Sequence, residues 1–476
     1  MLSYFVLRWG SNVSHSNTPR RLSVRASSHK IPFLKAVLFW LKLGFISFGG
    51  PAGQIAIMHQ ELVEKRRWIS ESRFLHALNY CMLLPGPEAQ QLATYIGWLM
   101  HKGWGGIIAG ALFVLPSLFI LIVLSWVYIS YGDVPLVVGV FYGIKPAVTA
   151  IILFAAYRIG LRAISNRILF GIAVAAFLAI FWFKLPFPVI VLFAGLIGFF
   201  GGRWRPHQFS VKAGHGAVAQ PKLSAIIDDH SALPKHAQFS VSKLVLACSI
   251  GFLLWLIPIL LLHFIYGWEH TLTQMAWFFT KAALVTFGGA YAVLPYIYQG
   301  AATQYGWATP QQMMDGLALG ETTPGPLIMV VAFVGFIGGY VNELFGPDQL
   351  LVAGAVAASL VTWFTFVPSF VFIFAGGPFI ETTHGNLKFT APLSAITAAV
   401  VGVILNLAVF FAYHMLWPDG FGETIDWLAL AISIVAMLNL FYFKLSIISV
   451  IIISASLGLF FYFINIADLL QLLAKL

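Results

Sequence analysis

Long apolar stretches separated by short polar ones run along almost the whole chain, and this pattern predicts membrane-spanning helices. Residues 105–131 and 445–465 are two such stretches, each as long as the roughly 20 residues that a helix needs to cross the hydrocarbon layer. In lipid the backbone must be hydrogen-bonded internally, and the chain lacks the alternating ten-residue segments of a membrane barrel. We therefore predict an all-α polytopic membrane protein.

The apolar stretches predict about 13 transmembrane helices. Six precede a polar segment, 203–243: 36–58, 74–100, 105–131, 134–157, 168–183 and 185–200. Seven follow it: 244–266, 272–298, 311–340, 351–375, 389–416, 425–443 and 445–465. The polar segment holds six basic residues, two acidic residues, three prolines and four histidines. This composition predicts a solvated cytoplasmic linker in preference to a histidine metal site.

The charges beside the spans predict how the chain is oriented in the membrane. Six spans return the chain to the side of its basic N-terminal tail, residues 1–35, which we favour over a transit peptide. Basic Arg158, Arg162, Arg167 and the linker then lie inside. The acidic residues that lie outside are Asp133, Glu269, Glu343, Asp348, Asp419, Glu423 and Asp426. The loop 61–73 is predicted to be external despite four basic residues, which suggests that a flanking segment is re-entrant.

Composition supports the membrane class and excludes others. Hydrophobic residues make up 60% of the chain and charged residues 9%, with a mean hydropathy of +0.88, so too few charges exist to cover a soluble surface. The net charge of +10 lies beside the spans and gives no indication of nucleic-acid binding. Cys81 and Cys248 lie far apart in apolar surroundings and predict neither a disulfide nor a metal site. No cofactor is expected.

The chain contains an internal repeat with a constant offset of 239 residues. Lys42, Phe48-Gly49-Gly50, Trp68 and Pro85-Gly86-Pro87 match Lys281, Phe287-Gly288-Gly289, Trp307 and Pro324-Gly325-Pro326. Further on, Leu115-Pro116-Ser117 matches Val367-Pro368-Ser369. Together with the span count, the repeat predicts two inverted halves, an architecture in which secondary transporters bind substrate near the midplane. The predicted segments are the tail 1–35, the first repeat 36–202, the linker 203–243, an inverting helix 244–271 and the second repeat 272–467.

The repeated motifs are those that interrupt helices, so we expect Phe-Gly-Gly and Pro-Gly-Pro to break or bend them. A broken helix leaves N–H groups that, at the positive end of its dipole, can bind an anion. The alternative is that these residues only aid close helix packing. The candidate substrate site comprises Phe48, Gly49, Gly50, Pro51, Pro85, Gly86, Pro87, Phe287, Gly288, Gly289, Pro324, Gly325 and Pro326.

Charged residues within the apolar segments are further candidates, because charges are costly in the membrane. Lys42 and Lys281 either supply paired cations for a divalent oxyanion or extend to the interface. Glu88 and Glu321 lie beside the two Pro-Gly-Pro motifs at positions that are not repeat-equivalent. Each is either a proton carrier coupled to the substrate or a helix cap. Lys145, Arg158 and Asn406 are weaker candidates.

These residues resemble the chromate ion transporter family in its long, two-domain form. The similar segments are 45–51, 64–69, 83–91, 287–289 and 323–326. The resemblance covers roughly residues 33–465 outside the linker. It implies export of chromate across the plasma membrane and hence chromate resistance, with sulfate as a competitor. Some members carry a histidine shortly after Gly-Gly-Pro where this chain has Gln54, so no role of that histidine can be transferred.

The predicted protein is therefore a secondary transporter, not an enzyme. The chain has no Gly-Lys dipeptide and so no P-loop, and no His-Glu dipeptide and so no HExxH zinc site. A proton or a counter-anion is the expected coupling partner, and membrane lipid surrounds the protein. Transport of sulfate or another small oxyanion is one alternative, and an anion channel is another. The oligomeric state is not predicted.

Overall fold

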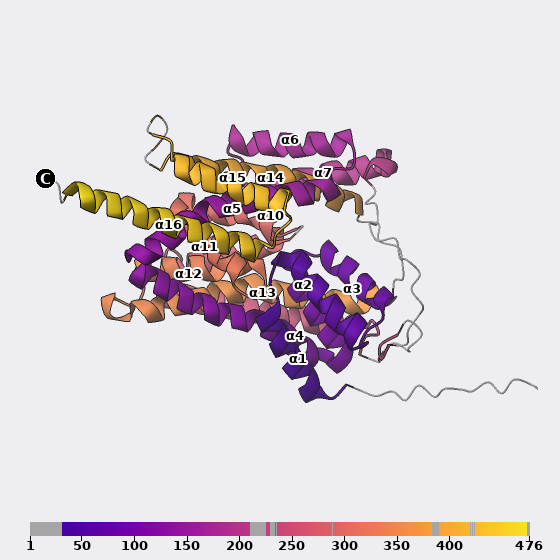
Figure 1. Ribbon diagram of the computed structural model, residues 1–476. Coiled ribbons are helices and arrows are strands. Elements are labelled where there is room, and N and C mark those ends of the chain that lie inside the picture. The colour runs from indigo at the N-terminus through magenta and orange to yellow at the C-terminus, as the bar shows by residue number, and fades with distance from the viewer. Residues whose placement is uncertain are drawn as a thin grey trace, which may run out of the picture. The chain divides into compact units, whose positions relative to one another are not determined.

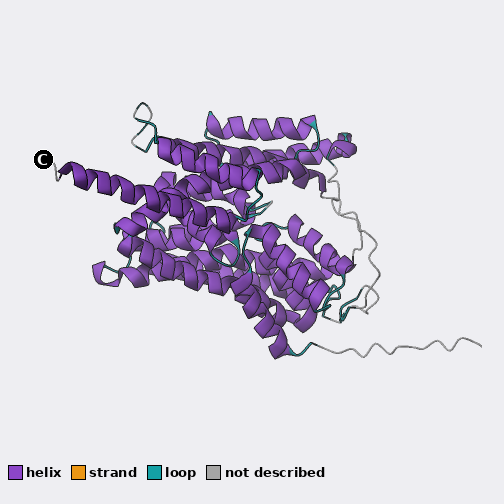
Figure 2. Cartoon of the chain, in the orientation of Figure 1, coloured by secondary structure: helices purple, strands orange, loops and turns teal. Residues whose placement is uncertain are grey.

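The computed structural model describes residues 31–209, 225–228, 234, 236–287, 289–382, 390–418, 420, 422 and 424–473. These residues form one compact unit. The described residues are helical apart from loops and one isolated bridge between Ile69 and Ile227, as Figure 2 shows. The all-α prediction is thereby confirmed.

The helices follow the order in Figure 1. Those before the linker are α1 (Phe33–Ile46), α2 (Gly50–His59), α3 (Glu71–Leu83), α4 (Glu88–Tyr131), α5 (Pro135–Ala163), α6 (Arg167–Phe181) and α7 (Phe187–Trp204). Those after it are α8 (Val241–Tyr266), α9 (Thr271–Val285), α10 (Ala290–Tyr298), α11 (Pro310–Thr322), α12 (Val330–Val341), α13 (Leu350–Thr382), α14 (Thr390–Leu416), α15 (Trp427–Phe441) and α16 (Ile447–Leu473). Short π-helices, Gln60–Lys65 and Gln299–Gln304, extend α2 and α10.

Among the described residues, seven helices are long and apolar enough to cross a membrane, and three shorter apolar helices accompany them. The long ones lie within 88–131, 135–163, 187–204, 241–266, 347–381, 391–416 and 447–464, and the shorter ones are 167–181, 327–341 and 427–441. The protein is therefore a polytopic membrane protein. Helix α14 packs against α5, α6 and α7, and α5 also packs against α15 and α16; Figure 1 shows α6 and α15 alongside α14.

Four of the predicted spans are not continuous helices, so the predicted count of 13 is not reproduced. The spans 36–58 and 272–298 are each interrupted at Phe-Gly-Gly, between α1 and α2 and between α9 and α10. The spans 74–100 and 311–340 are interrupted at Pro-Gly-Pro, between α3 and α4 and between α11 and α12. The motifs therefore break helices as expected, because proline lacks a backbone donor and glycine takes up positive φ. Helix α4 has a further kink at His101 and Lys102.

The broken helices of the first repeat begin and end at one end of the molecule, which we call the linker end. The turn after α2 pairs with the linker: Ser70 N donates to Ile227 O (3.0 Å), and Ile226 N donates to Arg67 O (3.1 Å). At the kink of α4, His101 Nε2 is 2.8 Å from Ile31 O, next to the start of α1. Each pair of half-helices in the first repeat therefore starts and finishes at the linker end.

The broken helices of the second repeat begin and end at the opposite end, the far end. Helix α8 is a single helix of 26 residues, about 39 Å long at 1.5 Å per residue, and it carries the chain from the linker to the start of α9. Gly338, near the end of α12, lies against Met275 of α9 and Trp307, which follows α10. The two repeats therefore extend into the molecule from opposite ends.

This arrangement corrects the predicted location of the loop 61–73. The loop lies at the linker end, together with the segment that the charges place inside, and so it is not on the opposite side. Lys65 Nζ donates to Glu61 Oε1 at 2.7 Å, and this hydrogen bond lowers the pKa of Glu61 below its ordinary value. The guanidinium of Arg66 lies over the ring of Phe39, 4.8 Å from its centroid. The basic residues of this loop therefore no longer contradict the positive-inside rule.

The described part of the linker is only partly exposed, which narrows the prediction of a solvated linker. Phe209 and Ala237 are buried, and Ile227 pairs with the backbone of Trp68 (3.0 Å). His236 Nε2 is 2.9 Å from Trp98 O, and burial lowers the pKa of this histidine. Apolar residues spaced among polar ones let the linker pack against the first repeat. Residues 210–224 lie outside the described part, as does the tail up to residue 30.

The opposite directions of the repeats can be tested with Lys65 and Gln304, the equivalent, exposed last residues of the two π-helices. In a background without Cys81 and Cys248, cysteines at these positions should react with a membrane-impermeant maleimide from opposite faces of sealed vesicles. The reason is that each residue lies where its own repeat begins and ends. Labelling of both cysteines from the same face would contradict the arrangement, and permeabilised vesicles serve as the control for reactivity.

Candidate functional site

The two repeats meet at a pair of reciprocal backbone hydrogen bonds between their helix breaks. Gly86 N, in the first Pro-Gly-Pro, donates to Thr286 O, which precedes the second Phe-Gly-Gly, at 2.7 Å. Gly325 N, in the second Pro-Gly-Pro, donates to Ser47 O, which precedes the first Phe-Gly-Gly, at 2.8 Å. Both donors and both acceptors are 239 residues apart. We call this pair of contacts, with the four helix breaks around it, the crossing.

Both donor positions require glycine, because the backbone has a positive φ there and no room exists for a Cβ atom. Gly86 has a φ of +125° and Gly325 a φ of +103°, in a region that other residues rarely adopt. A Cβ atom at Gly86 would lie 2.3 Å from Ser369 Oγ, and one at Gly325 would lie 2.7 Å from Ser117 Cβ. The two serines follow the repeated prolines of α4 and α13, so each repeat packs its serine against the glycine of the other.

Buried polar atoms without hydrogen-bond partners surround both glycines. Gln54 Nε2 donates to Gly325 O, while Gln54 Oε1 and the hydroxyls of Ser47 and Ser117 have no partner among the described residues. Near Gly86, Gln91 Nε2 donates to Pro85 O (2.8 Å), while Gln91 Oε1 and the hydroxyl of Ser369 have none. All five side chains are at most 1% exposed. Burying such groups is costly, so the crossing can bind a polar ligand.

The predicted motif residues are brought together at the crossing, with one difference from expectation. Gly289 lies against Pro51 of the other repeat, so the Phe-Gly-Gly breaks also meet. Phe48 and Phe287 are half-buried beside them, and Pro87, Pro324 and Pro326 are buried. However, the N–H groups of Gly86 and Gly325 bind carbonyl groups across the crossing, so they are not free for an anion as predicted. Gly288 lies outside the described residues.

The two predicted lysines do not lie at the crossing. Lys42 is exposed on α1. Lys281 Nζ lies 5.8 Å from the centroid of the Trp277 ring on its own helix, α9, as in a cation–π contact. Of the weaker candidates, Arg158 lies over Phe154 (5.6 Å) and Asn406 is half-buried on α14. Lys145, in contrast, has an acidic partner.

The two predicted carboxylates lie in different environments. Glu88 is the first residue of α4 and is half-buried, where the helix dipole favours a negative charge. Glu321 is 3% exposed near the end of α11. Its Oε1 accepts a hydrogen bond from Tyr291, the second residue of α10, and its Oε2 has no partner among the described residues. Glu321 is therefore a buried acid next to two helix breaks.

Sequence reasoning missed Asp315, a second buried acid on α11. Asp315 is 2% exposed, its Oδ2 lies 3.6 Å from Lys145 Nζ, and Tyr128 Oη donates to Oδ2 at 2.9 Å. Its spacing from the motif gave no signal, because the repeat-equivalent residue is His76.

Ser117 and Ser369 did carry a signal, since each follows a repeated proline, but only the fold brings them to the glycines of the opposite repeats.

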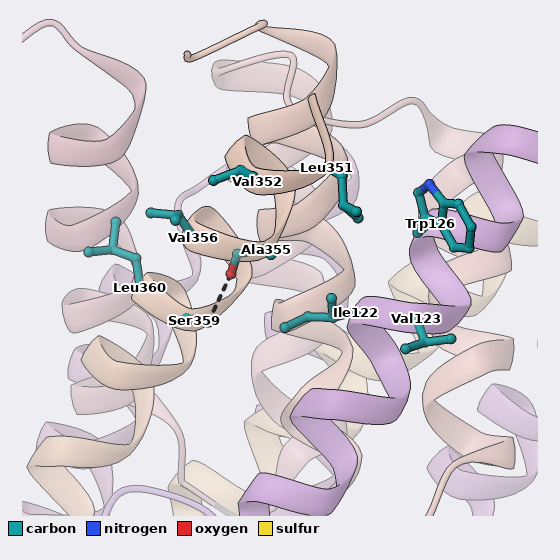
Figure 3. Close-up of a pocket in the computed structure, with 9 residues that line it drawn as sticks. All are labelled: Ile122, Val123, Trp126, Leu351, Val352, Ala355, Val356, Ser359 and Leu360. Carbon is teal, nitrogen blue, oxygen red and sulfur yellow. Dashed lines mark hydrogen bonds between the residues drawn. The ribbon is translucent and has the colours of Figure 1, made fainter. Parts of the chain in front are cut away.

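An apolar groove between α4 and α13, with a volume of about 740 Å³, is not a site for an ion. Figure 3 shows its lining, which includes Ile122, Trp126, Leu351 and Val356. Its hydroxyl group, on Ser359, donates to Ala355 O of the same helix at 2.8 Å. The groove is thus lined almost entirely by apolar atoms, and its hydroxyl already has a partner, in contrast to the buried hydroxyls at the crossing.

The fold and the crossing define a polytopic helical membrane protein built from two related halves. The family profile for the chromate transporter matches residues 34–199 and again residues 273–459. The chain therefore belongs to the chromate transporter family.

Three curated proteins illustrate the likeness within that family. A chromate transport protein of Cupriavidus metallidurans is 28% identical over 84% of this chain and 88% of its own length. A probable chromate transport protein of Synechococcus elongatus is 27% identical over 78% of this chain and 82% of its own. A chromate transport protein of Pseudomonas aeruginosa is 32% identical over 77% of each chain. No solved structure matches the chain.

The crossing predicts a specific effect of Gly325→Ala. The added Cβ both occupies a disfavoured φ, at roughly 1–3 kcal/mol, and collides with Ser117, so the variant should lower the melting temperature in detergent and abolish transport. Gly346→Ala is the matched control, because Gly346 has a φ of +87° but no atom within 4 Å of an added Cβ. Equal behaviour of the two variants would show that the crossing does not constrain the fold.

Proposed function

We propose that this protein is a secondary transporter that exports chromate from the cytoplasm across the plasma membrane and thereby confers chromate resistance. The observation that carries the proposal is the cluster of buried, unpartnered polar groups at the crossing of two repeats that extend from opposite ends. Chromate is proposed as the substrate because relatives of the chain are named chromate transport proteins. The resident oxyanion lies at the crossing, between the Phe-Gly-Gly and Pro-Gly-Pro breaks.

Hydroxyl groups and helix N-termini suit such a ligand. The hydroxyls of Ser47, Ser117 and Ser369 can rotate to donate to the oxygens of a tetrahedral dianion. Helices α2, α4 and α10 begin at the crossing, so the positive ends of their dipoles favour negative charge there. Gly86 and Gly325 act by holding the repeats together and not as donors. Lys42 and Lys281 attract the anion from outside the crossing.

The packing of the crossing favours a carrier over a channel. Both Pro-Gly-Pro glycines are buried against serines of the other repeat without room for a methyl group, so no continuous path passes between them in this state. An anion then crosses only when one repeat moves relative to the other, as in alternating access. This movement must break the present contacts at the crossing and form others.

The orientation that we propose places the linker end in the cytoplasm. Basic residues gather there, among them Lys65, Arg66, Arg162 and Arg203, while Asp133, Glu269 and Asp348 lie beside helix ends at the far end. Such a distribution follows the positive-inside rule. A membrane potential that is negative inside then favours export of an anion. For a dianion, the free energy gained is about 4.6 kcal/mol per 100 mV, twice the roughly 2.3 kcal/mol for one charge.

Glu88 and Glu321 are the proposed coupling residues. A buried carboxylate such as Glu321 resists ionisation unless it is paired, so its charge can respond to an anion or a proton arriving at the adjacent breaks. The Tyr291 hydroxyl keeps one of its oxygens in place. This placement supports the proposed exchange with a proton or a counter-anion.

The proposal is tested by uptake of labelled chromate into everted vesicles. Uptake should exceed that of vesicles without the protein, and an imposed membrane potential that is positive inside the everted vesicle should accelerate it. A pH gradient imposed separately distinguishes proton coupling. Labelled sulfate in the same assay tests the alternative substrate, since it has the same shape and charge. Uptake of neither anion, with no change in the chromate tolerance of sensitive cells, would refute the proposal.

The serines at the crossing provide a test of the site itself. Ser117→Ala and Ser369→Ala each remove one donor to the anion, so each should raise the KM of chromate roughly tenfold, the effect of about 1.4 kcal/mol. Ser359→Ala is the control on the same helix as Ser369, because its hydroxyl binds its own helix in the apolar groove. An unchanged KM in both crossing variants would remove the serines from the site.

A further inference from the structure

The ion pair between Lys145 and Asp315 joins the two repeats. Lys145 belongs to α5 and Tyr128 to α4, both in the first repeat, whereas Asp315 belongs to α11 in the second. Both first-repeat side chains contact the same carboxylate oxygen, Oδ2. The other oxygen, Oδ1, is buried without a partner among the described residues.

The pair lies between the crossing and the far end. Asp315 is the sixth residue of α11, which begins at the far end, and Tyr128 is three residues before the end of α4. Glu321 lies six residues further along α11, about 9 Å deeper at 1.5 Å per residue. Any movement that opens the molecule between the repeats from the far end must therefore separate Asp315 from Lys145 and Tyr128.

Separation leaves Asp315 with an unfavourable charge. A buried carboxylate that loses its cationic partner is strongly destabilised, and it can avoid this by taking up a proton. Of the described residues that contact Asp315, Lys145 on α5 and Tyr128 on α4 are the ionisable ones. Tyr291, on α10, contacts Glu321 instead. Lys145 is only 29% exposed, so it too depends on the pair.

Glu321 shows why Asp315 has a distinct role. The hydrogen-bond partner of Glu321, Tyr291, belongs to the same repeat, so a movement of one repeat against the other need not break that contact. The Asp315 contacts span the boundary between the repeats and must break. The equivalent residue of the first repeat is His76, so the arrangement is not duplicated at the linker end.

We propose that Lys145 and Asp315 form an ionic lock that closes the far end, and that a proton taken up from that side by Asp315 opens it. The proton binds to the carboxylate when the lock separates and leaves when the ion pair forms again. The inference extends the proposed function, since it names the residue through which external pH controls the conformational cycle, but it does not depend on the identity of the anion.

The test measures access to the space behind the lock and needs no substrate. Ala318, on α11 and 1% exposed, is replaced by cysteine in a background without Cys81 and Cys248, and a small impermeant thiol reagent is added at the far end. Thiols react as thiolates, so every labelling rate falls in acid; each rate is therefore divided by that of Gln304→Cys, an exposed position at the same end, at the same pH. This ratio should be low at alkaline pH and roughly 5- to 150-fold higher at acidic pH, the range of such couplings. Asp315→Asn should make the ratio high at both pH values.

Two further variants secure the interpretation. Asp133→Asn, an exposed acid after α4, should leave the pH response intact. The double variant Lys145→Met with Asp315→Asn removes both charges, so it should insert even where Asp315→Asn alone does not, and its labelling ratio should be high and independent of pH. A pH response that persists in the Asp315 variants, or that is lost equally in Asp133→Asn, would overturn the lock. Failure of chromate uptake would refute the proposed function and leave this result unaffected.

Discussion

The organisation of this protein depends on two backbone hydrogen bonds, from Gly86 to Thr286 and from Gly325 to Ser47. Each joins a Pro-Gly-Pro break of one repeat to the residue before a Phe-Gly-Gly break of the other. Backbone groups freed by broken helices must find partners inside a membrane protein, and here each repeat supplies them to the other. Neither repeat can therefore satisfy its own breaks alone. This requirement explains why all four breaks converge on one place.

The two repeats keep the same backbone plan but differ in their polar side chains. The first repeat has Gln54 and Gln91 at the crossing, where the second has Val293 and Val330. The second repeat has Asp315 and Glu321 on α11, where the first has His76 and Met82. Two buried amides thus belong to the first repeat and two buried acids to the second.

The contacts of the basic loop after α2 place it on a different side from the one that the span count predicted. Counting apolar stretches predicted that 36–58 spans the membrane, which placed a basic loop on the acidic side. The broken helices instead return to the linker end, because the chain changes direction at Phe-Gly-Gly and each half-helix, of 14 or 10 residues, is too short to cross by itself. The apparent exception to the positive-inside rule was a consequence of treating two half-helices as one helix.

The sequence by itself determined the membrane class, the duplication, the positions of the helix breaks and the family resemblance, because each of these depends on local composition or on residues at a fixed spacing. Only the tertiary structure decided which breaks meet, that Ser117 and Ser369 face glycines of the opposite repeats, that Lys42 remains exposed, and that Asp315 is paired with Lys145. Apart from the exposure of Lys42, these features join residues that are 170 to 283 positions apart. Such contacts follow from how two whole repeats pack, which no local pattern encodes.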